Sequence, residues 1–577
     1  MQHLMSCVLA AVSVAGAVSA ADLSIETVLP ERTAFAVSVT GIDTVLNRLE
    51  ATGVIDAAMS GTGEDLRESL LKGLPEVAQT VLRHTMRDKD PVELLRGVTF
   101  GGGIWPMDTP RGLVPIEWAA WADLGMLASP LATVIDEAFA DMRSDGRVST
   151  ERIGDVDVDH YEGDARDSGA QSYWFVHQSP WVMVASSKAG MERMLAVRRG
   201  EPTDGTPLGE TEAWMEASTM MGGTIGMRCV LMPEVLLDIV QMTPDGAMLG
   251  MVRPVLTTVL GRHETVAMRL DAGEDDVILE LRGGTYMPDG VDGMLSLLEN
   301  SDDRNLAVRQ FMDTDTVVVG EYNIAFGNLT DLIDRLLSSS PLLFVGKEPF
   351  DEARPILEDF LSPLGEQVTH IVSVQHPISA DSLRMLLVFE VTDRRRLEDA
   401  FSTYLSKGGF KVREFQGHQI WSMETPAILP GATAETLSLV AAGNWLLLGD
   451  DAAVESALRL LSGGATQPSW AKRMPRGLHL HGDTAAKGLV DLHGSMATML
   501  EIEALQAGRI RTALQAEDPE LWEELAGDFA EDDSTTLHQA KALASVLGVL
   551  LWSVERTETG FGFYGALTAP ADEGGTR

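Results

Sequence analysis

Two stretches of the chain share one pattern of apolar and polar positions. They are residues 173–200, YWFVHQSPWVMVASSKAGMERMLAVRRG, and residues 437–463, LSLVAAGNWLLLGDDAAVESALRLLSG. Each predicts an apolar strand, a tight polar turn and a second apolar strand that begins with a tryptophan, Trp181 or Trp445. A helix with apolar residues at helical spacing follows each time. The second stretch therefore reads as a diverged copy of the first.

Apolar positions elsewhere repeat the same order of elements. Residues 35–39 alternate as in a half-buried strand, and residues 42–49 carry apolar side chains at i, i+3, i+4 and i+7 as in a helix. Residues 316–320 and 329–336 have the same strand-then-helix pattern. Consecutive strands joined by short turns pair antiparallel, so we expect an α+β fold with an antiparallel sheet and helices on one face. The repetition predicts a tandem duplication of one large module.

Breaks in this pattern place the module boundaries. Pro288, two glycines and an acidic cluster interrupt the periodicity after the first copy, as in a linker. The second copy has an extra acidic segment with one apolar helix face, which predicts a packed surface helix or, alternatively, a partner-binding one. The predicted organisation is a signal peptide (1–20), a first α+β module (21–286), a linker (287–310), a second α+β module (311–570) with an acidic helical insertion at about 500–536, and a tail (571–577).

The N-terminal residues are typical of a secretory signal peptide. They are small and apolar, and Val18 and Ala20 stand at the −3 and −1 places of a cleavage site. The alternative is a buried N-terminal segment. No later stretch has the roughly 18 consecutive apolar residues of a membrane span. We therefore expect a soluble exported protein, periplasmic or extracellular, in which Cys229 is the single remaining cysteine.

The charge balance restricts the partners. The chain has 44 basic and 86 acidic residues, a formal net charge of −42. Such a surface repels phosphate backbones, so we expect no nucleic-acid partner. The charge favours solubility, or alternatively a surface that collects cations. With 45% hydrophobic residues over 577 positions, the chain has enough apolar side chains for more than one core.

One group of residues has the chemistry of a metal site. His479 and His481 alternate on a predicted strand, residues 477–481, that we match to strand 224–230 of the first copy; Asp483 follows just beyond. Two imidazoles and a carboxylate can bind zinc if they converge. The matching strand of the first copy has no histidine, so the same residues also fit an ordinary strand. Zinc is expected only under this alternative.

Other motifs predict no catalytic residues and no cofactor. Asp155, Asp157 and Asp159 alternate on a strand, which fits an exposed polar face better than a calcium loop. The chain has no GxSxG nucleophile elbow and no HExxH zinc motif. The triple glycine at 101–103 does not open a helix and so does not predict a phosphate-binding loop.

The opening of the first module, ETVLPERTAFAVSVTGIDTVLNRLEATGV, resembles a known family. This family comprises large uncharacterised exported bacterial proteins, common in planctomycete-type bacteria and built on a domain of unknown function. Leu29, Pro30 and Thr33 match its LP-x-x-T phrase, and residues 445–461 resemble its strand and helix. The second module has Met312-Asp313 where Leu-Pro is expected. The family has no established activity, so the resemblance implies no functional residue.

Two functions of different classes follow from these observations. The first is a non-enzymatic envelope protein that binds a partner protein or an apolar ligand across its two modules. The duplication and the missing catalytic motifs favour it. The alternative is a metal-assisted hydrolase that uses His479, His481 and Asp483.

Overall fold

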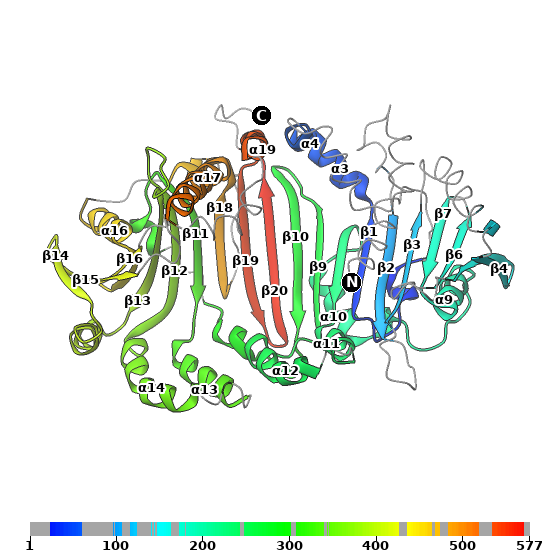
Figure 1. Ribbon diagram of the computed structural model, residues 1–577, viewed down its shortest axis with the longest axis horizontal. Coiled ribbons are helices and arrows are strands. Elements are labelled where there is room, and N and C mark those ends of the chain that lie inside the picture. Colours follow the sequence, from blue (N-terminus) through cyan, green and yellow to red (C-terminus); the bar gives the residue numbers. More distant parts are fainter. Residues whose placement is uncertain are drawn as a thin grey trace.

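The fold is a mixed α/β arrangement built on one antiparallel sheet, as a computed structural model shows (Figure 1). The structure describes residues 23–59, 96, 99–106, 116–123, 140, 143–144, 147–162, 172–178, 180–242, 247–301, 307–339, 343, 346–425, 435–463, 468–472, 483–517 and 533–570. Within these ranges a single sheet of 20 strands runs across the molecule.

Half of these strands come from the first part of the chain. They are β1 (Phe35–Thr40), β2 (Thr99–Pro106), β3 (Ile116–Asp123), β4 (Val148–Ile153), β5 (Val156–Tyr161), β6 (Tyr173–Gln178), β7 (Trp181–Ala185), β8 (Gly226–Leu231), β9 (Thr265–Ala272) and β10 (Val277–Tyr286). Their antiparallel pairings give the order β4-β5-β6-β7-β3-β2-β1-β8-β9-β10.

The second part of the chain supplies the other strands. They are β11 (Thr316–Asn323), β12 (Leu364–Val374), β13 (Leu383–Val391), β14 (Lys411–Phe415), β15 (His418–Thr425), β16 (Glu435–Ala442), β17 (Trp445–Asp450), β18 (Ala486–Asp491), β19 (Val549–Thr557) and β20 (Gly560–Thr568). Their order is β14-β15-β16-β17-β13-β12-β11-β18-β19-β20. This is the order of the first half with ten added to every strand number.

The last strand of each half joins the two halves. β10 and β20 pair antiparallel along their length, from Tyr286 opposite Gly560 to Val277 opposite Thr568. The sheet is therefore continuous across the molecule, and the backbone hydrogen bonds of each half's last strand depend on the other half.

The described helices lie around this sheet. They are α2 (Ile25–Val28), α3 (Ile42–Ala51), α4 (Val54–Met59), α9 (Lys188–Arg198), α10 (Glu212–Met221), α11 (Pro233–Gln241), α12 (Ala247–Leu260), α13 (Leu329–Ser339), α14 (Lys347–Leu361), α15 (Arg394–Ala400), α16 (Asp451–Gly463), α17 (Leu492–Glu517) and α19 (Asp533–Val546). Helices of different halves meet at opposite ends of the central strands, α4 with α19 and α12 with α13 (Figure 1).

Helices cover both faces of the sheet, which corrects the expectation of one covered face. Neighbouring residues of a strand point to opposite faces. In β12, Ile371 belongs to the core cluster that contains α16, whereas Val372 belongs to the cluster that contains Ile502 of α17. Helices α16 and α17 therefore pack on opposite faces. The local sequence pattern gives each helix an apolar stripe but not the face that it covers.

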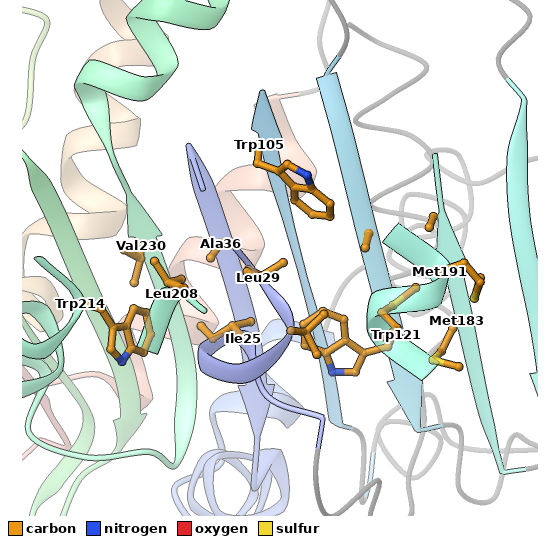
Figure 2. Close-up of a cluster of buried hydrophobic side chains, with 14 of the residues drawn as sticks. Ile25, Leu29, Ala36, Trp105, Trp121, Met183, Met191, Leu208, Trp214 and Val230 are labelled. Atoms are coloured by element: carbon orange, nitrogen blue, oxygen red, sulfur yellow. The ribbon is translucent and has the colours of Figure 1, made fainter. Parts of the chain in front are cut away.

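The core of the first half lies on the face that carries α2, α9 and α10. Figure 2 shows Ile25 and Leu29 over the strands, with Trp214 on one side and Trp121 and Met191 on the other. Leu29 is fully buried directly over Gly103, where a Cβ atom would stand 2.5 Å from a Leu29 methyl group. Only glycine leaves room for this contact, which holds the segment before β1 against the sheet.

Several predicted elements fall as expected. Residues 173–200, which share one pattern with residues 437–463, form β6, β7 and α9. Residues 437–463 form part of β16, then β17 and α16. In β5, Val156 and Val158 are buried while Asp157 is exposed, so the carboxylates do form a polar strand face. The expected linker, 287–310, lies between β10 and β11.

One strand assignment is wrong. The strand that occupies the place of β8 in the second half is β18, Ala486–Asp491, and not residues 477–481, which lie outside the described residues. Both segments follow a tryptophan and carry alternating apolar residues, so the local pattern did not separate them. Also outside the described residues are the expected signal peptide, the tail and the acidic part of the insertion from 518 to 532.

Candidate functional site

A pocket opens in the first half beside helix α9. It has a volume of about 540 Å³ and lies between the turn before β1, the adjoining ends of β2 and β3, and α9. We call it the first pocket. Its lining includes Glu31, Trp105, Glu117, Glu192 and Arg193. Within this lining, Trp105 Nε1 donates a hydrogen bond to Glu117 Oε2 at 2.7 Å.

A second pocket opens beside helix α16. It has a volume of about 210 Å³ and lies between the turn before β11, strands β12 and β13, and α16. We call it the second pocket. Asp313, Asp315, Arg384 and Arg459 supply its charged lining. The elements around it are the counterparts of those around the first pocket.

Strand register places the two pockets at the same position in their halves. Trp181 at the start of β7 pairs with Asp123, and Trp445 at the start of β17 pairs with Glu390. The register from these pairs matches two lining pairs on strands, Glu117 with Arg384 and Trp105 with Ser373. Counting back from β1 and β11 along the turns adds Pro30 with Asp313 and Arg32 with Asp315. Counting from the matched helix caps, where Gly190 and Ala453 donate to Ser187 and Asp450, adds the lining pairs Ala189 and Ala452, Gly190 and Ala453, Arg193 and Ser456, and Ala196 and Arg459.

The turn that borders each pocket also matches. Leu29 and Met312 occupy the same position and are 0% and 1% exposed. Thr33 and Thr316 close the turn, with Thr33 Oγ1 donating to the Pro30 carbonyl at 2.6 Å and Thr316 Oγ1 donating to Asp313 Oδ1 at 3.1 Å. The LP-x-x-T phrase of the first half is therefore a structural turn that becomes MD-x-x-T in the second half.

Each pocket contains one arginine with a buried N–H group that has no acceptor. In the first pocket, Arg193 donates to the carbonyls of Val28 and Asp204, and its Nη2 has no hydrogen-bond partner among the described residues. Burial lowers the pKa of the Arg193 guanidinium, an effect that Asp204 partly offsets. In the second pocket, Arg384 Nε is the buried donor without a hydrogen-bond acceptor.

A larger cavity, of about 770 Å³, lies where α12 meets α13. Its charged groups are largely engaged with one another, because Arg253 pairs with both Glu234 and Asp238. Burial raises the pKa of Glu264, with smaller contributions from Glu212 and Asp289. This cavity is bordered by both halves, through α12 of the first and α13 of the second, and so it is not repeated within each half as the two pockets are. We therefore take the paired pockets as the candidate site.

A buried carboxylate lies near the centre of the sheet. Glu321 of β11 is 6% exposed, and its Oε2 lies 3.9 Å from Lys487 Nζ of β18. Burial raises the pKa of Glu321 to about 7, although Lys487 and Arg309 lower it. Glu321 Oε1 has no hydrogen-bond partner among the described residues and borders a cavity of about 10 Å³, roughly the space of one water molecule.

Of the three predicted zinc ligands, the described part of the chain contains only Asp483. His479 and His481 lie outside it, and Asp483 is exposed just before β18. The described residues contain no group of three or more metal-ligating side chains. The zinc site remains a prediction from the sequence.

Sequence reasoning missed the pockets because their residues share no motif. The LP-x-x-T phrase pointed to one border, and the apolar stripe of α9 pointed to the helix. Glu117 and Arg193 gave no signal by themselves. An alignment of the two halves strand by strand could have found them, because it matches Glu117 of β3 with Arg384 of β13 as equivalent positions.

The fold and the paired pockets define a mixed α/β protein with a continuous antiparallel sheet and two matched surface pockets. Comparison of the chain with protein-family models, curated proteins and solved structures finds no match in any of the three. In the part of the chain that the structure describes, no helix has the length and apolarity needed to span a membrane.

Proposed function

We propose that the protein is an exported, non-enzymatic envelope protein that arose by tandem duplication and binds a partner protein through its two pockets. Matched pockets in the two halves are the observation that carries this proposal. Eight pairs of lining residues coincide when the strands, the turns before β1 and β11 and the caps of α9 and α16 are matched. The repeated strand order supports the duplication, and the signal-like residues 1–20 support export.

A protein partner fits these pockets better than an apolar ligand. Small-molecule sites are mostly apolar and enclosed, with a few polar groups. Charged side chains line both pockets, and the largest apolar one, Trp105, is 6% exposed and already bonded to Glu117. Two such surfaces on one rigid sheet would engage one partner at two points, which raises its apparent affinity.

The test is capture of a partner from an envelope extract of the source cells, with the full chain as bait. Ala189 and Ala452 are matched, exposed residues on the first turns of α9 and α16. The double variant Ala189→Trp/Ala452→Trp fills both pockets at positions where the fold has room for a larger side chain. Ala51→Trp, an exposed position at the end of α3, is the control.

We expect one protein to be captured by the parent chain and by the control but to be lost with the double variant. Capture that is unchanged by the double variant would remove the pockets from the proposal. Failure to capture any protein would contradict the binding function itself. Native mass spectrometry of the same sample tests the zinc-dependent alternative, because a bound zinc ion adds a defined mass.

A further inference from the structure

We propose that each pocket binds an extended, basic segment of the partner, and that a main-chain carbonyl of this segment accepts a hydrogen bond from the pocket's arginine. This inference rests on the proposed function and specifies the chemistry of its site. Three observations carry it: an unpaired buried donor in each pocket, carboxylates near that donor, and the charge of the whole chain.

In the first pocket the donor is fixed in place. Arg193 Nη1 donates to the Asp204 carbonyl at 2.6 Å, and its Nε donates to the Val28 carbonyl. These two bonds hold the planar guanidinium between α9 and the segment before β1. Nη2 is left as a buried donor without a partner, and such groups are costly unless an acceptor reaches them. Among the described residues, Nη2 is the guanidinium nitrogen of Arg193 that keeps an unused donor for an acceptor that enters the pocket.

The second pocket has the same feature, but its arginine comes from strand β13 instead of a helix. Arg384 Nη2 donates to Gln375 Oε1 at 3.0 Å, and its Nη1 donates to its neighbour's carbonyl, that of Leu383, at 3.3 Å. Its Nε is buried without a hydrogen-bond partner and lies 3.8 Å from Asp450 Oδ1. Arg384 matches Glu117 in position, and Arg193 matches Ser456. The two halves thus supply the arginine from different places and still leave one donor in each pocket.

Carboxylates accompany the donor in both pockets. Glu31 and Glu192 are exposed in the lining of the first pocket, where Glu192 lies 3.9 Å from Lys188. Asp313 and Asp315 take this role in the second pocket. A lysine or arginine side chain of the partner would pair with these groups. The net charge of −42 steers a basic segment toward the protein over long distances.

The acceptor is better matched by a carbonyl than by an anion. A phosphate or a free carboxylate would approach Arg193 past Glu31, Glu117 and Glu192, all of which repel it. A peptide carbonyl accepts the same hydrogen bond without a net charge. An extended segment presents such a carbonyl and a basic side chain within a few ångströms of each other.

The probe is a phage-displayed library of random dodecapeptides, panned on the full chain. Enriched peptides are then synthesised with a fluorophore, and their binding is measured by anisotropy. The Ala452→Trp background blocks the second pocket, so that these measurements read the first pocket alone. We expect enrichment of Lys and Arg in the selected peptides, and binding that weakens as salt is raised.

Two sets of variants distinguish the contact of the peptide with the pocket carboxylates from its contact with the Arg193 guanidinium. Glu31→Gln/Glu192→Gln removes the carboxylates at exposed positions, and we expect about tenfold weaker binding of the basic peptides. Arg193→Gln removes the guanidinium, and we expect a loss of similar size. Glu352→Gln on α14 and Arg335→Gln on α13 make the same charge changes at exposed sites outside both pockets and should leave binding unchanged.

An ester scan of one enriched peptide identifies the carbonyl. Replacing a peptide bond by an ester weakens its carbonyl as an acceptor and leaves the side chains intact. The ester also lacks the N–H of the peptide bond that it replaces. Each effect is therefore compared between the parent and Arg193→Gln. We expect one ester to weaken binding to the parent severalfold and to have no effect on Arg193→Gln. This readout is independent of any loss of stability in the variant.

Two results would overturn the inference. One is selection of acidic or apolar peptides that bind the parent and the Glu31→Gln/Glu192→Gln variant equally. The other is panning that enriches no peptide on the parent beyond what the Ala189→Trp/Ala452→Trp variant enriches. The proposed function survives both results if the capture experiment still shows a partner that the double variant loses.

Discussion

The two halves of the sheet place different charges at one and the same buried position. In the first half, Arg228 of β8 donates to Ser38 Oγ of β1 at 3.2 Å and pairs with Glu26 of α2. In the second half, the residues at these three positions are Lys487, Glu321 and Arg309. The carboxylate of this group lies on the short helix α2 in the first half and on strand β11 in the second. In the second half Arg309, on the turn Ala307–Phe311, stands at the position of Glu26.

This exchange has a clear energetic consequence. Glu26 has a side chain that is 23% exposed, so water still solvates part of its charge. Glu321 is 6% exposed, and burial outweighs the two neighbouring cations in setting its pKa near 7. Both halves therefore place opposite charges together at this position, but burial raises the pKa of the carboxyl in the second half. In the first half Glu26 pairs with Arg228, and in the second half the buried carboxyl of Glu321 has a pKa raised to about 7.

The matched turn before β1 and β11 gives the largest expected effects. Leu29→Ala should cost about 4 kcal/mol of unfolding free energy, because Gly103 beneath it cannot fill the space. Met312→Ala should cost about 3 kcal/mol, since Ile371 stands at the position of Gly103. Urea unfolding followed by tryptophan fluorescence measures both values. A cost below about 1 kcal/mol at either site would contradict the equivalence of the two turns.

Glu321 should make the stability of the second half depend on pH. Its folded pKa of about 7 exceeds the unfolded value of 4.5, so the folded state holds the proton more tightly. The stabilisation is complete below pH 4.5, falls between pH 4.5 and 7, and is lost above pH 7. The total change is about 3 kcal/mol.

The variant Glu321→Gln isolates this contribution. We expect the difference in unfolding free energy between Glu321→Gln and the parent to shift in favour of the variant by about 3 kcal/mol from about pH 4.5 to about pH 8. Urea titrations at both pH values measure it. The control is Glu264→Gln, a carboxyl in the first half, which should give a smaller shift. Equal shifts for the two variants would refute the assignment to Glu321.

The caps of the matched helices α9 and α16 give the smallest expected effects. Ser187 accepts the Gly190 N–H, and Asp450 accepts the Ala453 N–H, at the same position of each helix. Ser187→Ala should cost about 1 kcal/mol. Asp450→Ala should cost about 2 kcal/mol, because Asp450 also accepts the Met385 N–H. Thermal unfolding measures the loss of stability in each variant. A larger loss for Ser187→Ala than for Asp450→Ala would contradict the prediction.

The candidate site shows where prediction from sequence ends. Its borders were visible, because the LP-x-x-T phrase and the stripe Met191, Met194 and Leu195 are local patterns. Its lining was not visible, because Glu117 and Arg193 lie far apart in the chain and meet only when β3 and α9 pack together. The predicted zinc ligands were chosen for residue type and for alternation on a predicted strand; Asp483 lies exposed, and the zinc site stays a prediction.

The sequence by itself determined strands and helices such as β6, β7, α9, β16, β17 and α16 and their repeated order, because alternation of period two and stripes of period 3.6 are local properties of a chain. It did not determine the position of β18. Trp181 and Trp445 begin the corresponding strands β7 and β17 of the two halves, as their local patterns predict. Only the tertiary structure decided the pairing of β10 with β20, the face that each helix covers and the meeting of Glu321 with Lys487. These contacts join residues far apart in the chain, and apolar periodicity does not specify which distant strand completes a sheet.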